Sequence, residues 1–292
     1  MNSTFHIFQK MRLFPFSFLL LFTVLAGCTS TLQKEALLAY KVREPLNLEQ
    51  YQQANWFQPS KHTIKTMTVT HDDGLVVKGL RLSVHGSENT VLYFGGAPYQ
   101  EGLSKADILG QFAFLGLNVI AINNRGLDSH GEWPSLQRLK VDADNVYDQV
   151  RQAHPHDFLI VHGTAMSNFW VSDIASRYDM NAIVVEGVIT NFEEAIEQQP
   201  WWNRWKKYNN IADELQSLDI YQSLSGYEGP VLLLASENDP WSTPGLNQKL
   251  HGTISSLKKS IETISTAEPT DLLMQDDTLA AYMMFVKKYG YE

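Results

Sequence analysis

The stretch FLIVHGTAMS, residues 158–167, sets a short apolar run directly before a group of mostly small residues. A continuous apolar run of this length is typical of a strand that is buried on both faces of a sheet. Gly163 permits a close backbone approach, and the small side chains of Ala165 and Ser167 suit a tight turn. The stretch therefore predicts a buried strand over 158–162, a sharp turn, and a helix over 168–178.

Short apolar strands alternate with helical patterns along much of the chain. A hairpin is expected first, with strands over 64–70 and 75–84 around the turn residues 71–74. The alternation is typical of the α/β class, in which helices flank a mostly parallel sheet. The later patterns predict strands over 90–94, 118–122, 182–185, 231–235 and 260–264, and helices over 106–117, 141–153 and 279–289.

The N-terminus carries a different pattern. Lys10 and Arg12 precede an uncharged apolar run over 13–24, which is shorter than the roughly 20 residues that a membrane span needs. The sequence LAGC, which ends at Cys28, follows this run and resembles the bacterial lipobox, whose cysteine is acylated and becomes the mature N-terminus. We therefore expect residues 1–27 to be a lipoprotein signal peptide. The alternative is an ordinary secretory signal with a chance cysteine.

Lipidation at Cys28 predicts a bacterial envelope protein that is held by acyl chains rather than by a spanning helix. Thr29 follows the cysteine, and by resemblance to Gram-negative lipoproteins this residue favours the outer membrane, facing the periplasm. Translation from Met11 instead of Met1 would give a tidier signal. Residues 28–62 are then expected to form a lipid-anchored tether, with a short helix over 33–42, ahead of a domain over 63–292.

The mature chain is expected to be acidic. The full sequence has a formal net charge of −9, and removal of Lys10 and Arg12 with the signal makes it two units more negative, −11. Such a charge argues against nucleic acid as a partner. Cys28 is the only cysteine, so no disulfide supports the fold. The sequence contains no metal-ligand spacing and no phosphate-binding loop, and we expect neither a metal nor another cofactor.

Unusual residues cluster where the predicted strands end. Gly95 and Gly96 follow one strand, Arg125 follows a second, the turn over 163–167 follows a third, and Asp239 follows a fourth. In mostly parallel sheets, ligands bind at the carboxyl ends of the strands. These residues are therefore expected to lie together at one edge of the sheet.

Over roughly residues 63–290 the chain resembles the α/β-hydrolase superfamily, and within it the serine hydrolases with a leading β-hairpin. The loop NNRGLDSHG, residues 123–131, followed by Pro134 and Ser135, is similar to their R-G-x-x-S-x-G segment. The resemblance implies an α/β-hydrolase fold with a small cap insertion and places the triad acid at Asp239. It also implies an oxyanion hole near Gly95, Gly96, Ala97 and Met166.

Two of the three triad positions depart from the family pattern. In the nucleophile elbow G-x-S-x-G, Gly163 fits the first glycine, but Ala165 occupies the serine position and Ser167 the second glycine position. The base should follow the last strand, near 265–270, yet no histidine occurs after His251. A methyl group cannot attack a carbonyl, and an acid without an imidazole has no catalytic role. The resemblance therefore implies a hydrolase fold that has lost its activity.

An active esterase-like or peptidase-like hydrolase with a rearranged site is the alternative. Its nucleophile would be Ser167, Thr164 or Ser129, and its base His130 or His162. Structural roles are expected instead: a helix-start serine at 167, a capping or hydrogen-bonded hydroxyl at 164, a core histidine at 162 and a loop contact at 130.

Arg125 and Asp239 are both expected to have mainly structural roles. Arg125 is expected to brace its loop through carboxylates, with substrate binding as the alternative. Asp239 is expected to cap the helix that begins near 242–244 or to accept backbone N–H bonds.

Residues 187–228 are expected to form the cap over the site. Trp201 and Trp205 are spaced so that they share one helical face, and Trp202 lies between them. These rings either pack the cap onto the core or form an aromatic wall for an apolar ligand or a membrane-contacting rim. The function expected is thus binding of a small apolar ligand or of an envelope protein partner. A structural envelope protein with a filled pocket is the third possibility.

Overall fold

The computed structural model describes residues 30–38, 48–95, 105–125, 134–199, 208, 210–265 and 271–290. Within these residues the chain forms an eight-stranded sheet in the order β10-β9-β7-β6-β4-β5-β3-β2. The strands are β2 (His62–Thr70), β3 (Val76–Val84), β4 (Asn89–Phe94), β5 (Asn118–Ile122), β6 (Phe158–Thr164), β7 (Ala182–Glu186), β9 (Val231–Ser236) and β10 (Lys259–Ile264).

The sheet is mostly parallel, as the sequence predicts. Strand β3 pairs antiparallel with β2 and with β5, and the remaining strands pair parallel to one another. Strand β6 lies between β4 and β7, with His162 opposite Tyr93 on one side and Val184 on the other. The turn that follows β6 therefore begins near the middle of the sheet.

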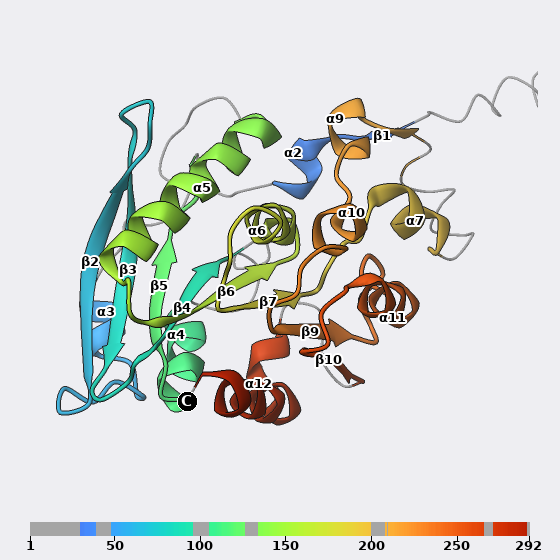
Figure 1. Ribbon diagram of the computed structural model, residues 1–292. Helices are drawn as coiled ribbons and strands as arrows, with labels where there is room; N and C mark the ends of the chain where they lie inside the picture. Colours follow the sequence, from blue (N-terminus) through green and yellow to red (C-terminus); the bar gives the residue numbers. More distant parts are fainter. Residues whose placement is uncertain are drawn as a thin grey trace, which may run out of the picture.

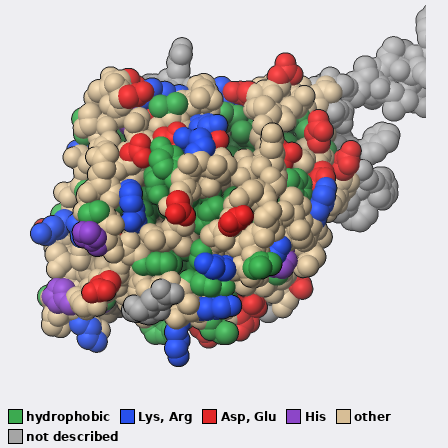
Figure 2. Space-filling view, in the orientation of Figure 1, with side chains coloured by type: hydrophobic (Ala, Val, Ile, Leu, Met, Phe, Trp, Pro, Cys, Tyr) green, Lys and Arg blue, Asp and Glu red, His purple; other side chains and the backbone are tan. Residues whose placement is uncertain are grey.

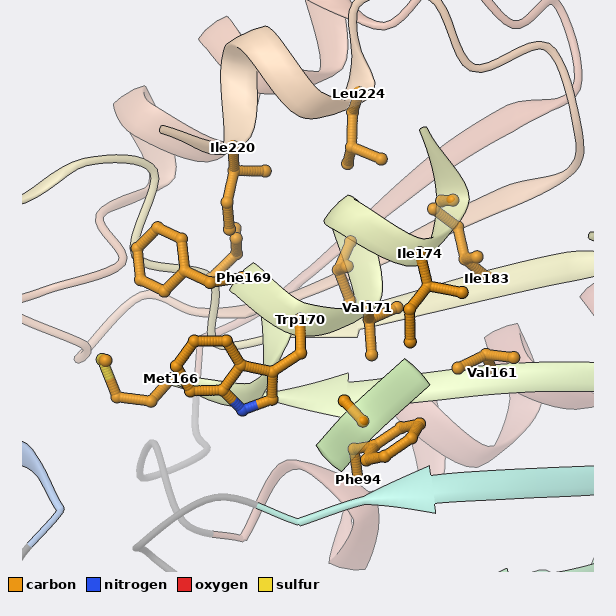
Figure 3. Packing of buried hydrophobic residues seen from close by; sticks show 14 of the residues in the cluster. Phe94, Val161, Met166, Phe169, Trp170, Val171, Ile174, Ile183, Ile220 and Leu224 are labelled. Atoms are coloured by element: carbon orange, nitrogen blue, oxygen red, sulfur yellow. The ribbon is translucent and has the colours of Figure 1, made fainter. Parts of the chain in front are cut away.

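Helices cover both faces of the sheet (Figure 1). One face carries α5 (Leu136–Ala153), α6 (Ser167–Ala175), α10 (Ile220–Leu224) and α11 (Pro244–Thr253), and the other carries α3 (Leu48–Gln52), α4 (Lys105–Phe114) and α12 (Asp276–Tyr289). Two large apolar clusters result, one on each face. Figure 3 shows the first, in which Met166, just before α6, and Phe169, Trp170, Val171 and Ile174 of α6 lie beside Ile220 and Leu224 of α10.

The boundaries that the sequence predicts differ from those of the structure by a few residues in most elements. The largest difference is in α5, which begins at Leu136 rather than near residue 141. The hydroxyl oxygen of Ser135 accepts a hydrogen bond from the backbone N–H of Arg138, at 3.1 Å, and so caps this helix. Apolar spacing alone does not reveal a start that depends on such a cap.

The region 187–228 contains α7 (Phe192–Glu197), β8 (Asn210–Ile211), α9 (Asp213–Gln216) and α10 in its described part. Phe192, Leu215 and Ile220 are buried in the same cluster as α6. This region packs directly on one face of the sheet domain. The division of the chain into signal, tether, domain and cap stays a prediction.

The segment expected to be a tether is packed on the domain wherever it is described. Strand β1 (Thr31–Leu32) pairs parallel with β8, and the short helix α2 (Lys34–Leu37) follows it. Leu32 and Leu38 are almost completely buried, and Tyr51 of α3 is buried on the opposite face. The polar composition of this stretch concealed the few apolar side chains that fix it.

Replacing Leu32 with alanine is expected to lower the free energy of unfolding by about 2–4 kcal/mol, because a fully buried leucine leaves a cavity. Urea denaturation monitored by tryptophan fluorescence measures the change. The matched control is Leu257→Ala, since Leu257 is 98% exposed and its removal should leave stability unchanged. Equal stability of the two variants would show that the N-terminal segment is not part of the folded unit.

Candidate functional site

The turn between β6 and α6 has the backbone geometry of a strained strand-to-helix turn. Ala165 has a φ of +47° and is the only non-glycine residue with a positive φ in the described part of the chain. Its N–H donates to the carbonyl of Glu186 at 3.0 Å, and its own carbonyl accepts from the N–H of Asn168 at 3.2 Å. Ala165 therefore occupies the apex of the turn, with its methyl group partly exposed.

Gly163 allows α6 to lie close against β6. A Cβ atom at this position would meet Asn168 Oδ1 at 2.8 Å and Val171 Cγ2 at 2.9 Å, both on α6. The Asn168 side chain also donates to the carbonyl of Glu186, at 2.8 Å. The first glycine of the motif thus has a packing role that does not depend on any reaction.

Ser167 is the first residue of α6 and is buried. Its oxygen accepts from the N–H of Thr164 at 2.7 Å. It also lies within hydrogen-bonding distance of two carbonyl oxygens, those of Phe94 and, at 2.8 Å, Thr164, to either of which the hydroxyl proton can be donated. The side chain joins β4, β6 and α6, and this geometry does not present its oxygen to a substrate.

His162 is completely buried in the layer of α4 and α12. Its Nε2 lies 3.0 Å from a carboxylate oxygen of Glu186. The rings of Tyr93, Phe112 and Tyr282 pack around it, with centroid distances of 4.8, 5.9 and 5.7 Å. Its Nε2 is therefore engaged within the core and not with the hydroxyl of Ser167.

Asp239 follows β9 and accepts two backbone hydrogen bonds. Its Oδ1 receives the N–H of Trp241 at 2.8 Å and that of Ser242 at 3.1 Å. Burial raises the pKa of this carboxyl above its usual value, and the two N–H donors oppose that rise. The hydroxyl of Thr243, rather than Asp239, caps α11, accepting from the N–H of Leu246 at 3.4 Å.

Asp239 nevertheless lies next to the turn at Ala165. A Cβ atom added to Gly187 would lie 3.6 Å from Asp239 Oδ2, and Glu186, the preceding residue, bonds the apex through its carbonyl. The positions that the sequence resemblance assigns to nucleophile and acid are therefore gathered around the end of β7. Gly187 has a φ of +56°, which a side chain would strain.

Arg125 forms a network of ion pairs. Its guanidinium makes two bonds to Asp142, at 2.6 and 2.9 Å, and a third contact to Asp73 at 2.8 Å. Arg138 of α5 contacts Asp142 as well, at 3.0 Å, and also Asp72. The network joins the β2–β3 turn, the end of β5 and α5. This is the bracing geometry that the sequence predicts for Arg125.

Aromatic side chains pack beside the turn. The ring of Phe192 from α7 stacks on Phe169 of α6 at 5.7 Å and meets Trp241 edge-on at 6.4 Å. Phe192 and Phe169 are both buried. No motif in the sequence marks Phe192 or Trp241. The available signal is the position of Trp241, two residues after Asp239.

A groove of about 630 Å³ opens between the start of α5, α6 and the α9–α10 region. Polar side chains dominate its walls, and Trp170 and Phe169 supply aromatic surface. Figure 2 shows acidic and basic side chains interspersed over the face of the molecule that it presents. The groove is suited to a polar or amphipathic ligand more than to a purely apolar one.

Several predicted site residues lie outside the described residues: Cys28, Gly96, Ala97, Ser129, His130, Trp201, Trp202 and Trp205. Of the oxyanion-loop positions, Gly95 accepts a hydrogen bond from the Asn124 side chain at 3.2 Å, and Met166 is buried at the start of α6. Among the described residues, no group of three or more potential ligands could hold a metal ion. The helices in that same part are too short or too polar to cross a membrane.

Solved structures of other proteins superpose on most of this chain. An esterase from Pyrococcus furiosus superposes with a TM-score of 0.65 over 86% of this chain and 98% of its own, at 13% identity. The chain has the α/β-hydrolase fold. An esterase domain from Rhodothermus marinus gives a TM-score of 0.59 at 15% identity, over 78% of this chain and 100% of its own.

A larger α/β-hydrolase-fold protein is also similar. The acylaminoacyl peptidase from Pyrococcus horikoshii gives a TM-score of 0.60 at 15% identity, and the match covers 80% of this chain and 42% of the peptidase. No family model matches the sequence, and no curated protein sequence is similar to it. The likeness is therefore one of fold.

Replacing Ala165 with glycine is expected to leave the protein equally stable or up to about 1 kcal/mol more stable. Glycine adopts a positive φ without strain, which gains roughly 1–2 kcal/mol. This gain outweighs the greater conformational entropy that glycine gives to the unfolded chain. Thermal unfolding measures the difference. The matched control, Ala280→Gly on the exposed side of α12, should cost about 1 kcal/mol. Equal losses in both variants would contradict the strained geometry.

The Arg125 network is expected to make stability depend on pH in acid. The pKa of Asp73 is lowered from 3.8 to about 2, mainly by the hydrogen bond from Arg125. Because the folded-state pKa is depressed, this stabilisation is complete above pH 3.8 and is lost as the pH falls towards 2.

Arg125→Gln should therefore be less stable at neutral pH, by about 2 kcal/mol through lost bonds to Asp142. It should also lose less stability than the natural protein on further acidification. Urea midpoints measured between neutral and acidic pH test this, with the exposed Lys65→Gln as the control. Parallel pH profiles for Arg125→Gln and the natural protein would exclude the Asp73 contribution.

Proposed function

We propose that this protein is a bacterial envelope lipoprotein whose α/β-hydrolase fold has lost serine hydrolase activity and binds a ligand or a partner. The single observation that carries the loss of activity is Ala165. It occupies the apex of the turn between β6 and α6, with a φ of +47°, where a nucleophilic oxygen would be required. The absence of histidine after His251 supports the same conclusion for the base.

The surroundings of the turn argue against Ser167 as an alternative nucleophile and His162 as an alternative base. The Ser167 oxygen is buried and bonded to the backbone, while His162 pairs with Glu186 in the layer on the opposite face. A general base must reach the proton that it removes, and these two groups belong to different networks. A rearranged site built from Ser167 and His162 is therefore disfavoured.

Binding rather than catalysis is supported by the groove beside α6. Its volume of about 630 Å³ lies within the range of small-molecule sites. The walls come from the sheet domain and from the α9–α10 region together, so a ligand there would contact both. The similar structures are an esterase and a peptidase, so ester and amide hydrolysis are the reactions to test.

The purified protein is expected to remain unlabelled by a fluorophosphonate probe, because Ala165 offers no oxygen to the phosphorus. Gel fluorescence measures the labelling, with a heat-denatured sample as the background and an active serine hydrolase as the positive control. Ala165→Ser should also stay at background, since the segment near 265–270, where the triad base is expected, contains no histidine to take up its proton. Stoichiometric labelling of the natural protein would refute the loss of activity.

Mass spectrometry of detergent-extracted protein should show acyl chains on a chain that begins at Cys28. Under native conditions the same sample should also show an added mass from a retained ligand or partner. Cys28→Ala should be released from the membrane fraction, because the acylated cysteine is its anchor. An unmodified chain, or unchanged membrane retention of the variant, would contradict the lipoprotein assignment. Absence of any added mass would favour a structural role.

A further inference from the structure

The N-terminal segment is docked on the folded domain almost from its first described residue. Thr31 and Leu32 pair with Asn210 and Ile211, and the N–H of Ala212 donates to the carbonyl of Leu32 at 3.0 Å. Lys34 then forms an ion pair with Glu214 of α9, at 3.1 Å. Figure 1 shows β1, α2 and α9 side by side, on the side of the molecule away from β2.

Burial holds this segment in place. Leu32 is 0% exposed and Leu38 is 1% exposed, both within the cluster that contains α6. Burying a leucine side chain removes apolar surface from water and so stabilises the packed position of the segment. Releasing the segment would expose both leucines and break the β1–β8 pairing. Residues 31–38 therefore behave as part of the domain rather than as a flexible spacer.

The distance available to a lipid anchor is consequently short. Only residues 29 and 30 lie between Cys28 and Thr31. A fully extended chain spans at most about 3.6 Å per residue, so the Cα atom of residue 28 lies within about 11 Å of the Cα atom of Thr31. This limit depends on covalent geometry alone.

We propose that the corner formed by β1, β8 and α9 is held directly against the lipid bilayer that receives the acyl chains of Cys28. The inference rests on the lipidation proposed above, and it adds the orientation of the molecule. An acylated cysteine lies at the level of the lipid headgroups, so Thr31 and its neighbours on β8 and α9 face those headgroups. The far edge of the sheet, at β2, then points away from the membrane.

The charges at this corner indicate that the anchor sets the orientation. The charged side chains of β1, α2, β8 and α9 are Lys34, Glu35, Asp213 and Glu214. Three of these four are acidic, which gives an anionic membrane no electrostatic reason to attract this corner. The contact should therefore not be weakened by salt, unlike that of a basic surface, because salt screens the repulsion between acidic side chains and anionic headgroups.

Single introduced cysteines can test the orientation. Cys28 is the only cysteine, and its thiol is consumed by the proposed lipidation. Asp213→Cys lies on α9, whereas Lys65→Cys lies on β2; both positions are exposed. Each full-length, lipidated variant is labelled with a fluorophore and reconstituted into vesicles that contain a nitroxide-headgroup lipid.

We expect quenching at position 213 to be several-fold stronger than at position 65, and not weakened by added salt. A Gly/Ser insertion of eight residues between Thr29 and Ser30 adds up to about 29 Å of reach. This insertion should remove most of the difference between the two positions. Equal quenching at both positions in the acylated protein, or a difference that survives the insertion, would overturn the proposed orientation.

The experiment separates this inference from the proposed function. If mass spectrometry finds no acyl chains on the reconstituted variants, the lipoprotein assignment fails and the orientation fails with it. If the acyl chains are present but the two labels are quenched equally, the lipoprotein assignment stands and only the orientation is wrong.

Discussion

The close approach of α6 to β6 is the constraint on which the arrangement of the site depends. Gly163 leaves no side chain between the strand and Asn168, and the Asn168 side chain reaches the carbonyl of Glu186 at 2.8 Å. That same carbonyl receives the N–H of Ala165, at 3.0 Å. The position of the helix, the positive φ of the apex and the end of β7 are therefore determined together.

The sequence predicts the centre of the sheet well because β4, β7 and β9 are short, mostly apolar runs that are buried on both faces. It predicts the turn because small residues occupy 163, 165 and 167 in a motif with known geometry. It could not predict which face receives His162, because a residue at the end of a buried strand can pack on either side. Nor could it reveal the Phe192–Phe169 stack, since that contact joins segments far apart in the chain.

The N-terminal segment is a second place where sequence patterning was insufficient. Residues 30–38 have a mixed composition, and Leu32 and Leu38 are buried in a cluster whose other members lie far along the chain. Only two leucines of this segment are buried, and two positions six residues apart give no periodic signal. Their role appears only when the tertiary surface that accepts them is present.

The three side chains of the turn contribute unequally to its geometry. Gly163 and Ser167 each satisfy a contact that the backbone needs, one by leaving space and the other by bonding Thr164 and Phe94. The methyl group at 165 satisfies none of these contacts. Of the three positions, the apex is therefore the one where a substitution disturbs the fold least. A single substitution at the apex can therefore remove the nucleophile of an enzyme with this fold and leave the turn and the packing of α6 unchanged.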